Sequence, residues 1–559
     1  MNWRFRFTFL AIIFLFFVVI ARLFYWQVIR AQELSIMGQM QYGKVITTTP
    51  KRGEIKTSDN FPIATNKITY RVFANPKEVK DIKDTSFELS QILAADEASI
   101  SASLSLDKFW VSIAENIDPE KKEEVEKLKL PGVGFEQQYS RFYPEGSMAA
   151  QLIGFVGKDD LAKPKGYFGI EGYYDMLLKG KEGKAIQVHD AFGRPILAKL
   201  SSVSNQIDGS NLLLTIDRSA QFLVEKRLKE GIEKYGAQSA MAAVMNPKTG
   251  EIIAMASFPN FDPMDYKVYS EALYKNPFIT DTYEPGSTFK PLVMSAALDA
   301  KLVTPKTKCP ICAGPVSIGG YDIHTWNDKY YKDINMIDVI KHSDNTGMVY
   351  VAQKLGVEGM IKYLNRFGIG DLTGIDLQGE VSPGLKDKNL WYPVDLATTG
   401  FGQGISITPI ELLSAISTIA NKGKRMQPFV VSAIQNPDKS TVKIEPKVLS
   451  KPISEETAKV MTEIMVNAVD NGEASWVRLK GYRVAGKTGT ASIPIAGHYD
   501  PNQTIASFVG FAPANDPKFV MLVIFNRPQS SIYGAETAAP VFFQIAKDLL
   551  IYYQIPPNE

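Results

Sequence analysis

Apolar residues are concentrated at the start of the chain, where they form one nearly uninterrupted run. Residues 7–21 carry no charge, and the LFYWQVI that follows Arg22 extends the run to residue 29. About 23 residues can cross a hydrocarbon core about 30 Å thick, so the pattern predicts a transmembrane helix over residues 7–29. No A-x-A-like cleavage site follows the run, which favours a retained anchor over a cleaved signal peptide.

The charges around this run predict its orientation. Arg4 and Arg6 precede it, and basic residues favour the cytoplasmic side of a membrane span. Residues 1–6 are therefore expected to form a cytoplasmic tail. No comparable apolar run occurs later in the chain, so the remainder is expected to be one extracytoplasmic body, held at the cell membrane by a single-pass anchor.

Beyond the span, the pattern changes to short runs of β-branched and aromatic residues bounded by Gly and Pro. KVITTTPKRGEI and TYRVFANP are examples, and such runs are typical of strands. The segment DPEKKEEVEKLKLPG, at 118–132, predicts a short charged helix that Pro-Gly ends. We interpret residues 35–205 as a strand-rich region with inserted helices.

From about residue 206 the pattern becomes more regular. A strand and then a helix capped by Asp217 are predicted to form a connection over 206–236. The segment SAMAAVMNPKTGEIIAMASFP predicts a hairpin, and YRVAGKTGTAS, ASFVGFAP and KFVMLVIFN predict three later strands. A helical pattern fills 287–470 between these groups, and APVFFQIAKDLLIYYQ at the end is again helical. Strands from both ends of 237–552 would then build one sheet of an α+β domain.

Composition argues against several classes of function. Lys and Arg number 62 and Asp and Glu number 60, which gives a net charge of +2. The chain therefore lacks the basic field that a nucleic-acid partner normally needs. Its four histidines, His189, His324, His342 and His498, lie far apart in the sequence. They do not favour a histidine-rich metal site or a histidine-based catalytic triad.

The two cysteines form one Cys-x-x-Cys pattern, Cys309 and Cys312. A structural zinc site usually needs two such pairs. Two free thiols and a short-loop disulfide both remain open, and a disulfide is plausible if this part of the chain lies outside the cytoplasm. A thioredoxin-like redox centre is not favoured, because no matching strand and helix flank the pair.

Candidate chemistry begins with Ser-x-x-Lys, which can pair a hydroxyl nucleophile with a base. The pattern occurs three times, at Ser105–Lys108, Ser287–Lys290 and Ser440–Lys443, where about two are expected by chance. Ser105 is expected on one face of a strand or in a loop, and Ser440 in a turn that enters a strand. Positions i and i+3 of a strand point to opposite faces, so these two lysines would face away from their serines.

Ser287 differs by its position in the chain. Pro285 and Gly286 precede it, and PLVMSAALDAKL follows with helical spacing, so Lys290 is expected on the same helix face one turn later. Pro291 falls near the first turn, where its missing N–H costs little. The start of a helix also offers N–H groups to an oxyanion. The alternative for this serine is a plain helix N-cap.

A serine hydroxyl needs a base to take its proton, and lysine is a base only where burial or a nearby cation keeps it neutral. Serine acyl enzymes combine Ser-x-x-Lys with Ser-Asp-Asn and Lys-Thr-Gly. Ser-Asp-Asn and Lys-Thr-Gly each occur twice, and their first copies, at 58–60 and 248–250, fall in expected turns. The second Ser-Asp-Asn, Ser343–Asn345, lies between two helical stretches. The second Lys-Thr-Gly, Lys487–Gly489, lies on an apolar strand, where glycine lets a substrate backbone approach closely.

In this order, Ser287–Lys290, Ser343–Asn345 and Lys487–Thr490 resemble the transpeptidase domain of the penicillin-binding proteins. The segments NPKTGEIIAMAS, YEPGSTFKP, TGFGQGISITPIELL and SFVGFAPANDPKFV resemble framework segments of that family. RGEI, RFYPEGSMAAQLIGFVG and GIEGYYDMLLKGKEG resemble the pedestal of its class B, monofunctional members, and the RLFYWQV span fits them too. The resemblance covers about residues 1–550. One departure is Lys56–Asn60, where the family often has an Asp-Arg-Asn-Gly-like turn.

The resemblance implies an architecture of three parts. They are the transmembrane helix, a pedestal (dimerisation-type) domain at 35–205 and a penicillin-binding domain at 237–552. The last would have an antiparallel sheet flanked by helices, as in serine β-lactamases and D,D-peptidases. No glycosyltransferase segment is expected before the pedestal.

The resemblance also implies a role for each residue of the site. Ser287 attacks the carbonyl of the penultimate D-Ala of a peptidoglycan stem peptide and releases the terminal D-Ala, with Lys290 as its general base. Ser343 relays a proton to the leaving amine, with Lys487 near it. Asn345 holds the substrate backbone.

The strand Lys487-Thr488-Gly489-Thr490 completes the implied site. The hydroxyls of Thr488 and Thr490, with Lys487, hold the terminal carboxylate, and N–H groups of Ser287 and Thr490 form the oxyanion hole. The acyl-enzyme then passes to an amine of a second stem peptide, and β-lactams acylate Ser287 as substrate mimics. No metal or organic cofactor is expected.

The same resemblance implies partners and leaves alternatives. Class B members usually work with a polytopic SEDS-family glycosyltransferase, and the compact pedestal and SFVGFAPANDPK favour a septal role, with divisome proteins, over a lateral one. A D,D-carboxypeptidase or β-lactamase would use the same serine with water as acceptor, but the pedestal and retained span argue against both. An inactive β-lactam-binding sensor or scaffold is a further alternative, and the complete set of catalytic residue types argues against it.

Overall fold

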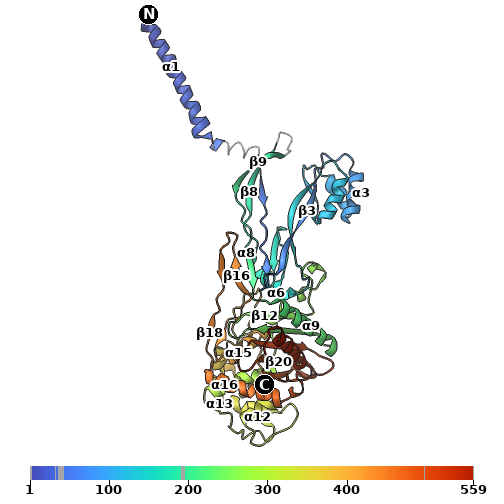
Figure 1. Cartoon of the computed structure of the whole chain (residues 1–559), viewed down its shortest axis with the longest axis vertical. Coiled ribbons are helices and arrows are strands. Elements are labelled where there is room, and N and C mark those ends of the chain that lie inside the picture. The colour runs from blue at the N-terminus through green and yellow to red at the C-terminus, as the bar shows by residue number, and fades with distance from the viewer. Residues whose placement is uncertain (1–2, 32, 35–42, 190–194, 496–497, 558–559) are drawn as a thin grey trace. The chain divides into compact units, whose positions relative to one another are not determined.

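The computed structural model describes residues 3–31, 33–34, 43–189, 195–495 and 498–557. The chain folds into two compact units, each assembled from several segments (Figure 1). The first comprises Met1–Gly53, Asn66–Ser140 and Lys179–Gly209, and the second comprises Glu54–Thr65, Arg141–Leu178 and Ser210–Glu559.

The first unit begins with a long apolar helix. Helix α1 (Trp3–Phe24) continues into a π-helical turn, η1 (Tyr25–Ile29). Together they make 27 residues, and an 18-residue stretch within them has a mean hydropathy of 2.7 and is not buried against the protein. Arg22 places its guanidinium 5.1 Å from the centre of the Trp26 ring, which suits a charge near the polar boundary of a membrane. A helix over the predicted span is thereby confirmed, and its length and composition suit an anchor.

Two groups of strands make up most of the rest of the first unit. Strands β1 (Gly43–Thr48), β8 (Gly183–His189) and β9 (Pro195–Ser204) form an antiparallel sheet in the order β1-β8-β9. Strand β3 (Pro62–Ala74), which starts in the second unit, pairs with β4 (Val111–Ile117) and β5 (Val133–Phe142). Apolar side chains of β3 and β4 share a small core with helices α3 (Ile82–Leu93), α4 (Glu97–Leu104) and α5 (Pro119–Lys127). The charged helix predicted within 118–132 is thus confirmed as α5.

The strand expected around Ser105 is wrong, because the residues before it form helix α4. Ser105 itself is the C-cap residue that follows this helix, in a turn. The side chain of Asp96 caps the start of this helix by accepting from the Ser99 N–H, and Glu97 is favourable in the first turn. These helix-start signals at Asp96 and Glu97 outweigh the strand that the alternating serines of this segment predict.

In the second unit, a small sheet joins distant parts of the chain. Strand β10 (Asn211–Leu214) pairs in parallel with β2 (Ile55–Lys56) and antiparallel with β16 (Val431–Gln435), and β17 (Thr441–Lys443) pairs with β16. The predicted helical stretch at 287–470 is therefore interrupted. Its residues 425–450 hold four short strands, which include β15 (Arg425–Met426) and β18 (Val448–Ser450).

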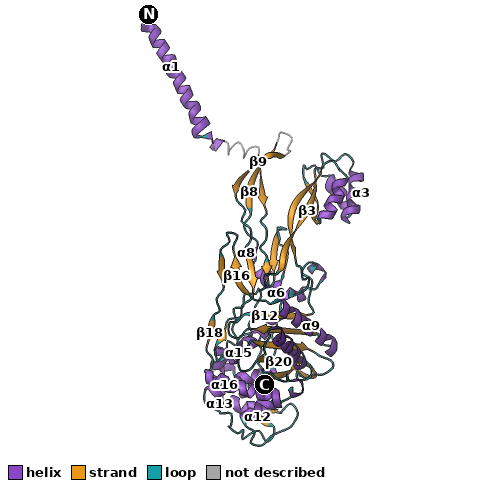
Figure 2. Ribbon diagram, in the orientation of Figure 1, coloured by secondary structure: helices purple, strands orange, loops and turns teal. Residues whose placement is uncertain are grey.

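The largest part of the second unit is a five-stranded antiparallel sheet in the order β12-β11-β21-β20-β19. The strands are β11 (Ser239–Met245), β12 (Ile252–Phe258), β19 (Ala485–Ile495), β20 (His498–Ala512) and β21 (Phe519–Asn526). The hairpin, the later strands and the construction of the sheet from both ends of 237–552 are confirmed. Side chains of β11 alternate: Met241 and Ala243 enter one apolar core, and Ala240 and Ala242 enter the other. Helices therefore cover both faces of this sheet (Figure 2).

One helical layer consists of α9 (Arg218–Tyr235) and α17 (Ala538–Tyr552), which pack on the same face of the sheet. The Asp217 side chain accepts from two N–H groups at the start of α9, as predicted. On the other face lie α11 (Lys290–Asp299), α12 (Met336–Lys341), α13 (Asn345–Phe367), α15 (Pro409–Ala420) and α16 (Glu455–Asn471). This second layer carries most of the candidate site residues.

Shorter elements complete the second unit. They are α6 (Ala150–Ile153), β6 (Phe155–Lys158), β7 (Pro164–Tyr167), α7 (Gly169–Tyr173), α8 (Asp175–Leu178), α10 (Pro277–Thr280), β13 (Val316–Ile318), β14 (Tyr321–Ile323) and α14 (Pro393–Thr399), with 3-10 turns η2 (Tyr266–Val268), η3 (Glu271–Leu273), η4 (Gly286–Phe289), η5 (Lys388–Leu390) and η6 (Ser475–Val477).

Candidate active site

Ser287 lies in the 3-10 turn η4, which leads directly into α11. Gly286 has φ +56°, and a Cβ there would lie 3.2 Å from the Cβ of Ala491 on β19. Its N–H donates to the Gly402 carbonyl at 2.9 Å. The turn is thus held close to β19, and the residue at its entry must be a glycine. Ser287 makes no side-chain cap for either helical element, so the plain N-cap alternative does not describe it.

Lys290 is fully buried one turn beyond Ser287. Its Nζ lies 2.6 Å from the carbonyl oxygen of Ser343, 3.2 Å from Ser343 Oγ and 2.8 Å from Asn345 Oδ1. Ser343 Oγ in turn lies 2.9 Å from Ser287 Oγ. The serine and lysine of the first motif are therefore linked through the hydroxyl of the second.

The environment of Lys290 favours its neutral form. Burial is the main cause, and the charge of Lys487 adds to it, while Asp344 and Glu473 oppose it; together they lower the pKa of Lys290 to about 7. A lysine with a pKa near neutrality can accept a proton at physiological pH.

Ser343 and Asn345 are positioned by the junction between α12 and α13. Ser343 has φ +55°, a left-handed conformation that costs a non-glycine residue of the order of 1 kcal/mol and places its side chain at the turn. Asp344 is buried and caps α13, since its Oδ1 accepts from the Gly347 N–H at 2.9 Å. Asn345 Nδ2 donates to the carbonyl of His324 at 2.9 Å, so the loop before α12 supports the amide from a second side.

Lys487, Thr488, Gly489 and Thr490 lie on β19 at the edge of the sheet. Lys487 and Thr488 are buried, and Lys487 Nζ donates to Thr488 Oγ1 at 3.0 Å. Burial lowers the pKa of Lys487, and the charge of Glu473 opposes that effect. A Cβ at Gly489 would lie 2.7 Å from Cγ2 of Thr288, so glycine allows η4 to approach this strand. Thr490 is half-buried, and its Oγ1 accepts from the Gly534 N–H at 3.0 Å.

The other copies of the motifs are not assembled into such a site. Ser105 and Ser440 are exposed, and their hydroxyls bind local acceptors, the Ser101 carbonyl and the Asp438 carboxylate. Lys248 is exposed in the turn between β11 and β12 and forms an ion pair with Asp516. The turns expected at Ser440 and at Lys248 are both confirmed.

Three features near the site belong to none of the three motifs. Glu473 accepts from the Thr488 hydroxyl at 2.7 Å. Gly534 binds Thr490, as described above. Trp326 and Tyr533 stack edge to face with ring centroids 5.6 Å apart, and the Trp326 indole N–H donates to the His342 carbonyl at 3.2 Å. All of them lie in loops, where sequence periodicity carries no signal.

Cys309 and Cys312 form a disulfide, and both are fully buried. The backbone on either side is tied down as well: Cys309 N–H donates to the Ile334 carbonyl, and Tyr331 N–H donates to the Cys312 carbonyl. Of the two alternatives left open by the sequence, the structure contains the disulfide. It closes a loop within the segment that also supplies the His324 carbonyl to Asn345.

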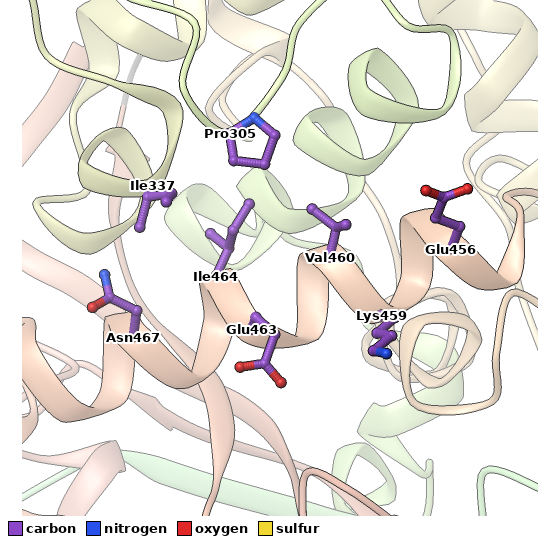
Figure 3. Close-up of a pocket in the computed structure, with 8 residues that line it drawn as sticks. All are labelled: Pro305, Ile337, Glu456, Lys459, Val460, Glu463, Ile464 and Asn467. Atoms are coloured by element: carbon purple, nitrogen blue, oxygen red, sulfur yellow. The ribbon is translucent and has the colours of Figure 1, made fainter.

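One cavity in the second unit, of about 590 Å³, lies along α16 (Figure 3). Pro305 and Ile337 form one wall, and Val460, Ile464 and other residues of α16 form the opposite one. None of the motif residues lines this cavity.

Comparisons with known proteins agree with the motifs. A family model described as the penicillin-binding protein transpeptidase domain matches residues 240–547, and one described as the penicillin-binding protein dimerisation domain matches residues 47–214. The chain is 34% identical to stage V sporulation protein D of Bacillus subtilis over its whole length and 86% of that protein. It is 30% identical to peptidoglycan D,D-transpeptidase FtsI of Escherichia coli, over its whole length and 93% of that protein.

Solved structures show the same fold. A peptidoglycan synthetase from Bifidobacterium adolescentis superposes with a TM-score of 0.75 at 26% identity, over 92% of this chain and 98% of that one. Penicillin-binding protein 2X from Streptococcus thermophilus superposes with a TM-score of 0.76 at 24% identity, over 91% and 80% of the two chains.

Proposed function

The chain belongs to the class B penicillin-binding proteins, and from this premise we propose that it is a membrane-anchored peptidoglycan D,D-transpeptidase with Ser287 as its nucleophile. The observation that carries the assignment is the hydrogen-bonded line from Ser287 through Ser343 to the buried Lys290. The substrate is a stem peptide ending in D-Ala-D-Ala, and β-lactams acylate the same serine.

The geometry around Lys290 suggests the path of the first proton. A neutral lysine has two N–H hydrogens and one lone pair. The carbonyl oxygen of Ser343 and Oδ1 of Asn345 can only accept, so they take the two hydrogens at 2.6 and 2.8 Å. The lone pair then faces Ser343 Oγ at 3.2 Å. Ser343 can donate its proton to Lys290 while it accepts the proton of Ser287.

Acylation then follows from this proton transfer. Ser287 Oγ forms a bond to the carbonyl carbon of the penultimate D-Ala as its proton moves through Ser343 to Lys290. The same line returns the proton to the nitrogen of the terminal D-Ala, whose C–N bond breaks. An amine of a second stem peptide then attacks the ester, its proton follows the reverse path, and Ser287 is restored with a cross-link formed.

The remaining site residues bind the substrate in this proposal. Asn345, held between Lys290 and the His324 carbonyl, binds the substrate backbone. Lys487 attracts the terminal carboxylate, and Thr490 offers a hydroxyl beside it. Thr488 contributes by accepting from Lys487 while its own hydroxyl donates to Glu473, and Gly489 keeps the strand accessible. N–H groups of Ser287 and Thr490 form the oxyanion hole.

Two further points extend the proposal to the cell. We assign residues 1–6 to a cytoplasmic tail, 7–29 to the span, 35–205 to the pedestal, 206–236 to a connection and 237–552 to the catalytic domain, which lies outside the inner membrane. Relatives named FtsI support a septal role, with a SEDS-family glycosyltransferase and divisome proteins as partners.

Covalent labelling tests the nucleophile. The full chain in detergent should bind a fluorescent penicillin covalently, and Ser287→Ala should abolish the band. Ser105→Ala and Ser440→Ala are matched controls from the other two Ser-x-x-Lys patterns, and both should label normally. Persistent labelling of folded Ser287→Ala would refute the assignment. A fluorescent fusion that lines the sidewall and avoids the septum would refute the septal role alone.

A further inference from the structure

Glu473 is a carboxylate at the edge of the site with no role in the mechanism above. It follows the C-terminal end of α16 by two residues and is half-buried. The hydroxyl of Thr488 donates to Glu473 Oε2 at 2.7 Å, and Lys487 Nζ donates to the oxygen of that hydroxyl at 3.0 Å. Lysine, threonine and glutamate thus form a continuous hydrogen-bonded line.

The stability of α16 does not explain this glutamate. The C-terminal end of a helix carries partial negative charge, so a carboxylate there is unfavourable by a few tenths of a kcal/mol or more. The last turn of α16 contains no basic residue to offset it. The placement of Glu473 is therefore explained by what its side chain contacts.

The backbone holds Glu473 against the catalytic wall. Gly472 packs so closely that a Cβ there would lie 2.9 Å from the carbonyl oxygen of Lys341. Lys341 ends α12, two residues before Ser343. The turn that carries Glu473 and the segment that carries Ser343 therefore support each other.

Lys487 needs a negatively charged neighbour to keep its proton. Its side chain is buried on β19, and burial disfavours an ammonium ion there. The charge of Glu473 opposes this effect of burial on Lys487. Glu473 and Asp344 both raise the pKa of Lys290, and His342, between α12 and α13, also lies within the electrostatic reach of Glu473.

We propose that Glu473 is a positioning residue for acyl transfer: acting through the Thr488 hydroxyl, it fixes the Lys487 side chain and stabilises its positive charge. The inference rests on the proposed function, because Lys487 is the cation that meets the terminal carboxylate of the substrate. While Glu473 accepts the hydrogen of Thr488, that hydroxyl is not a donor to the substrate. The carboxylate is then held by Lys487 and by Thr490.

The pH dependence of acylation tests this role. The second-order rate constant for labelling of the full chain by a fluorescent penicillin is measured from about pH 6 to about pH 10. Glu473→Gln keeps an acceptor for Thr488 but removes the charge. Its falling limb, where Lys487 loses its proton, should move to lower pH by about 1 unit. Glu473→Asp restores the charge and should move the limb back towards that of the wild type.

A matched control comes from the same helix. Glu463 is an exposed carboxylate on α16 that pairs with Arg483 at 2.7 Å. Glu463→Gln should leave both limbs of the profile unchanged, which separates a local effect from the loss of any negative charge. Thermal denaturation of each variant confirms that the compared proteins are folded.

The outcomes distinguish this inference from the function on which it rests. If both limbs of the pH profile of Glu473→Gln superpose on those of the wild-type protein, the inference is overturned. A uniform loss of rate without any shift would overturn it too, since a merely structural role predicts that result. Failure of the wild-type protein to label would instead refute the proposed function, and the inference with it.

Discussion

Raising the pH through neutrality should switch on acylation, because Lys290 must lose a proton before it can accept one. Burial and the charge of Lys487 lower the pKa of Lys290 from 10.5 to about 7. The active form is the deprotonated one, so the rate should increase as the pH rises through this pKa and then level off. This rising limb is distinct from the falling limb that belongs to Lys487.

The magnitude follows from the titration of a single group. With a pKa of about 7, about a tenth of Lys290 is neutral at pH 6, half at pH 7 and about nine tenths at pH 8. The acylation rate constant should therefore rise roughly tenfold from pH 6 to pH 8. A lysine with an ordinary pKa would be less than about 0.1% neutral at pH 7, and the rate would rise tenfold for each unit well beyond pH 8.

The assay is the time course of covalent labelling by a fluorescent penicillin, quenched at intervals and read on a denaturing gel. The carboxylate of the ligand stays ionised over this range, so the ligand does not contribute to the change. A rate constant that rises tenfold per unit without levelling off would refute the argument that burial prepares Lys290 as a base. A rate independent of pH from 6 to 8 would refute its role as the base.

Three further perturbations test other parts of the structure. Asp344→Asn keeps a good helix N-cap but removes a negative charge that raises the pKa of Lys290. The rising limb of the labelling profile should therefore shift to lower pH. A shift to higher pH would contradict the effect assigned to the charge of Asp344. Gly489→Ala places a Cβ 2.7 Å from Cγ2 of Thr288. Labelling should fall at least tenfold, and thermal or denaturant unfolding should show a destabilisation of about 1–3 kcal/mol. Near-normal labelling would show that β19 and the turn η4 can move apart. Replacing Cys309 and Cys312 together by serine opens a loop of about four residues. The free energy of unfolding, measured by denaturant titration, should fall by about 2 kcal/mol. An unchanged midpoint would show that the backbone hydrogen bonds to Ile334 and Tyr331 hold the loop without the disulfide.

The sequence predicts the central sheet well because its signals are local. Strands β11 and β12 are apolar runs around an obvious turn, and both are covered by helices, so their periodicity needs no tertiary information. The order of the three motifs predicts a site with Ser287, Ser343 and Lys487 for a different reason. Each of these side chains lies at a defined point in or next to a helix or a strand, and those helices and strands are themselves predictable from the sequence.

The features missed by the sequence depend on contacts between distant segments. The strands at 425–450 are short, and β16 is specified by its pairing with β10, more than two hundred positions earlier. Glu473 stands in a loop, and only the tertiary structure brings it to Thr488. The strand predicted around Ser105 is wrong for the opposite reason: the start signal of a helix at Asp96 is visible in the sequence, and it outweighs the alternating serines.

The pairing of β11 with β21 has a consequence for how the protein comes to be made. Met241 lies opposite Ile524 in the middle of the sheet, so the two partners are synthesised far apart in time. Until β21 emerges, β11 has an unpaired edge on an apolar strand, which is a site for misassociation. Long-range pairings of this kind also slow folding. A growing chain therefore cannot complete this sheet until β21 has been synthesised, and covalent labelling by penicillin is expected to report completion of the whole sheet as well as the reactivity of Ser287.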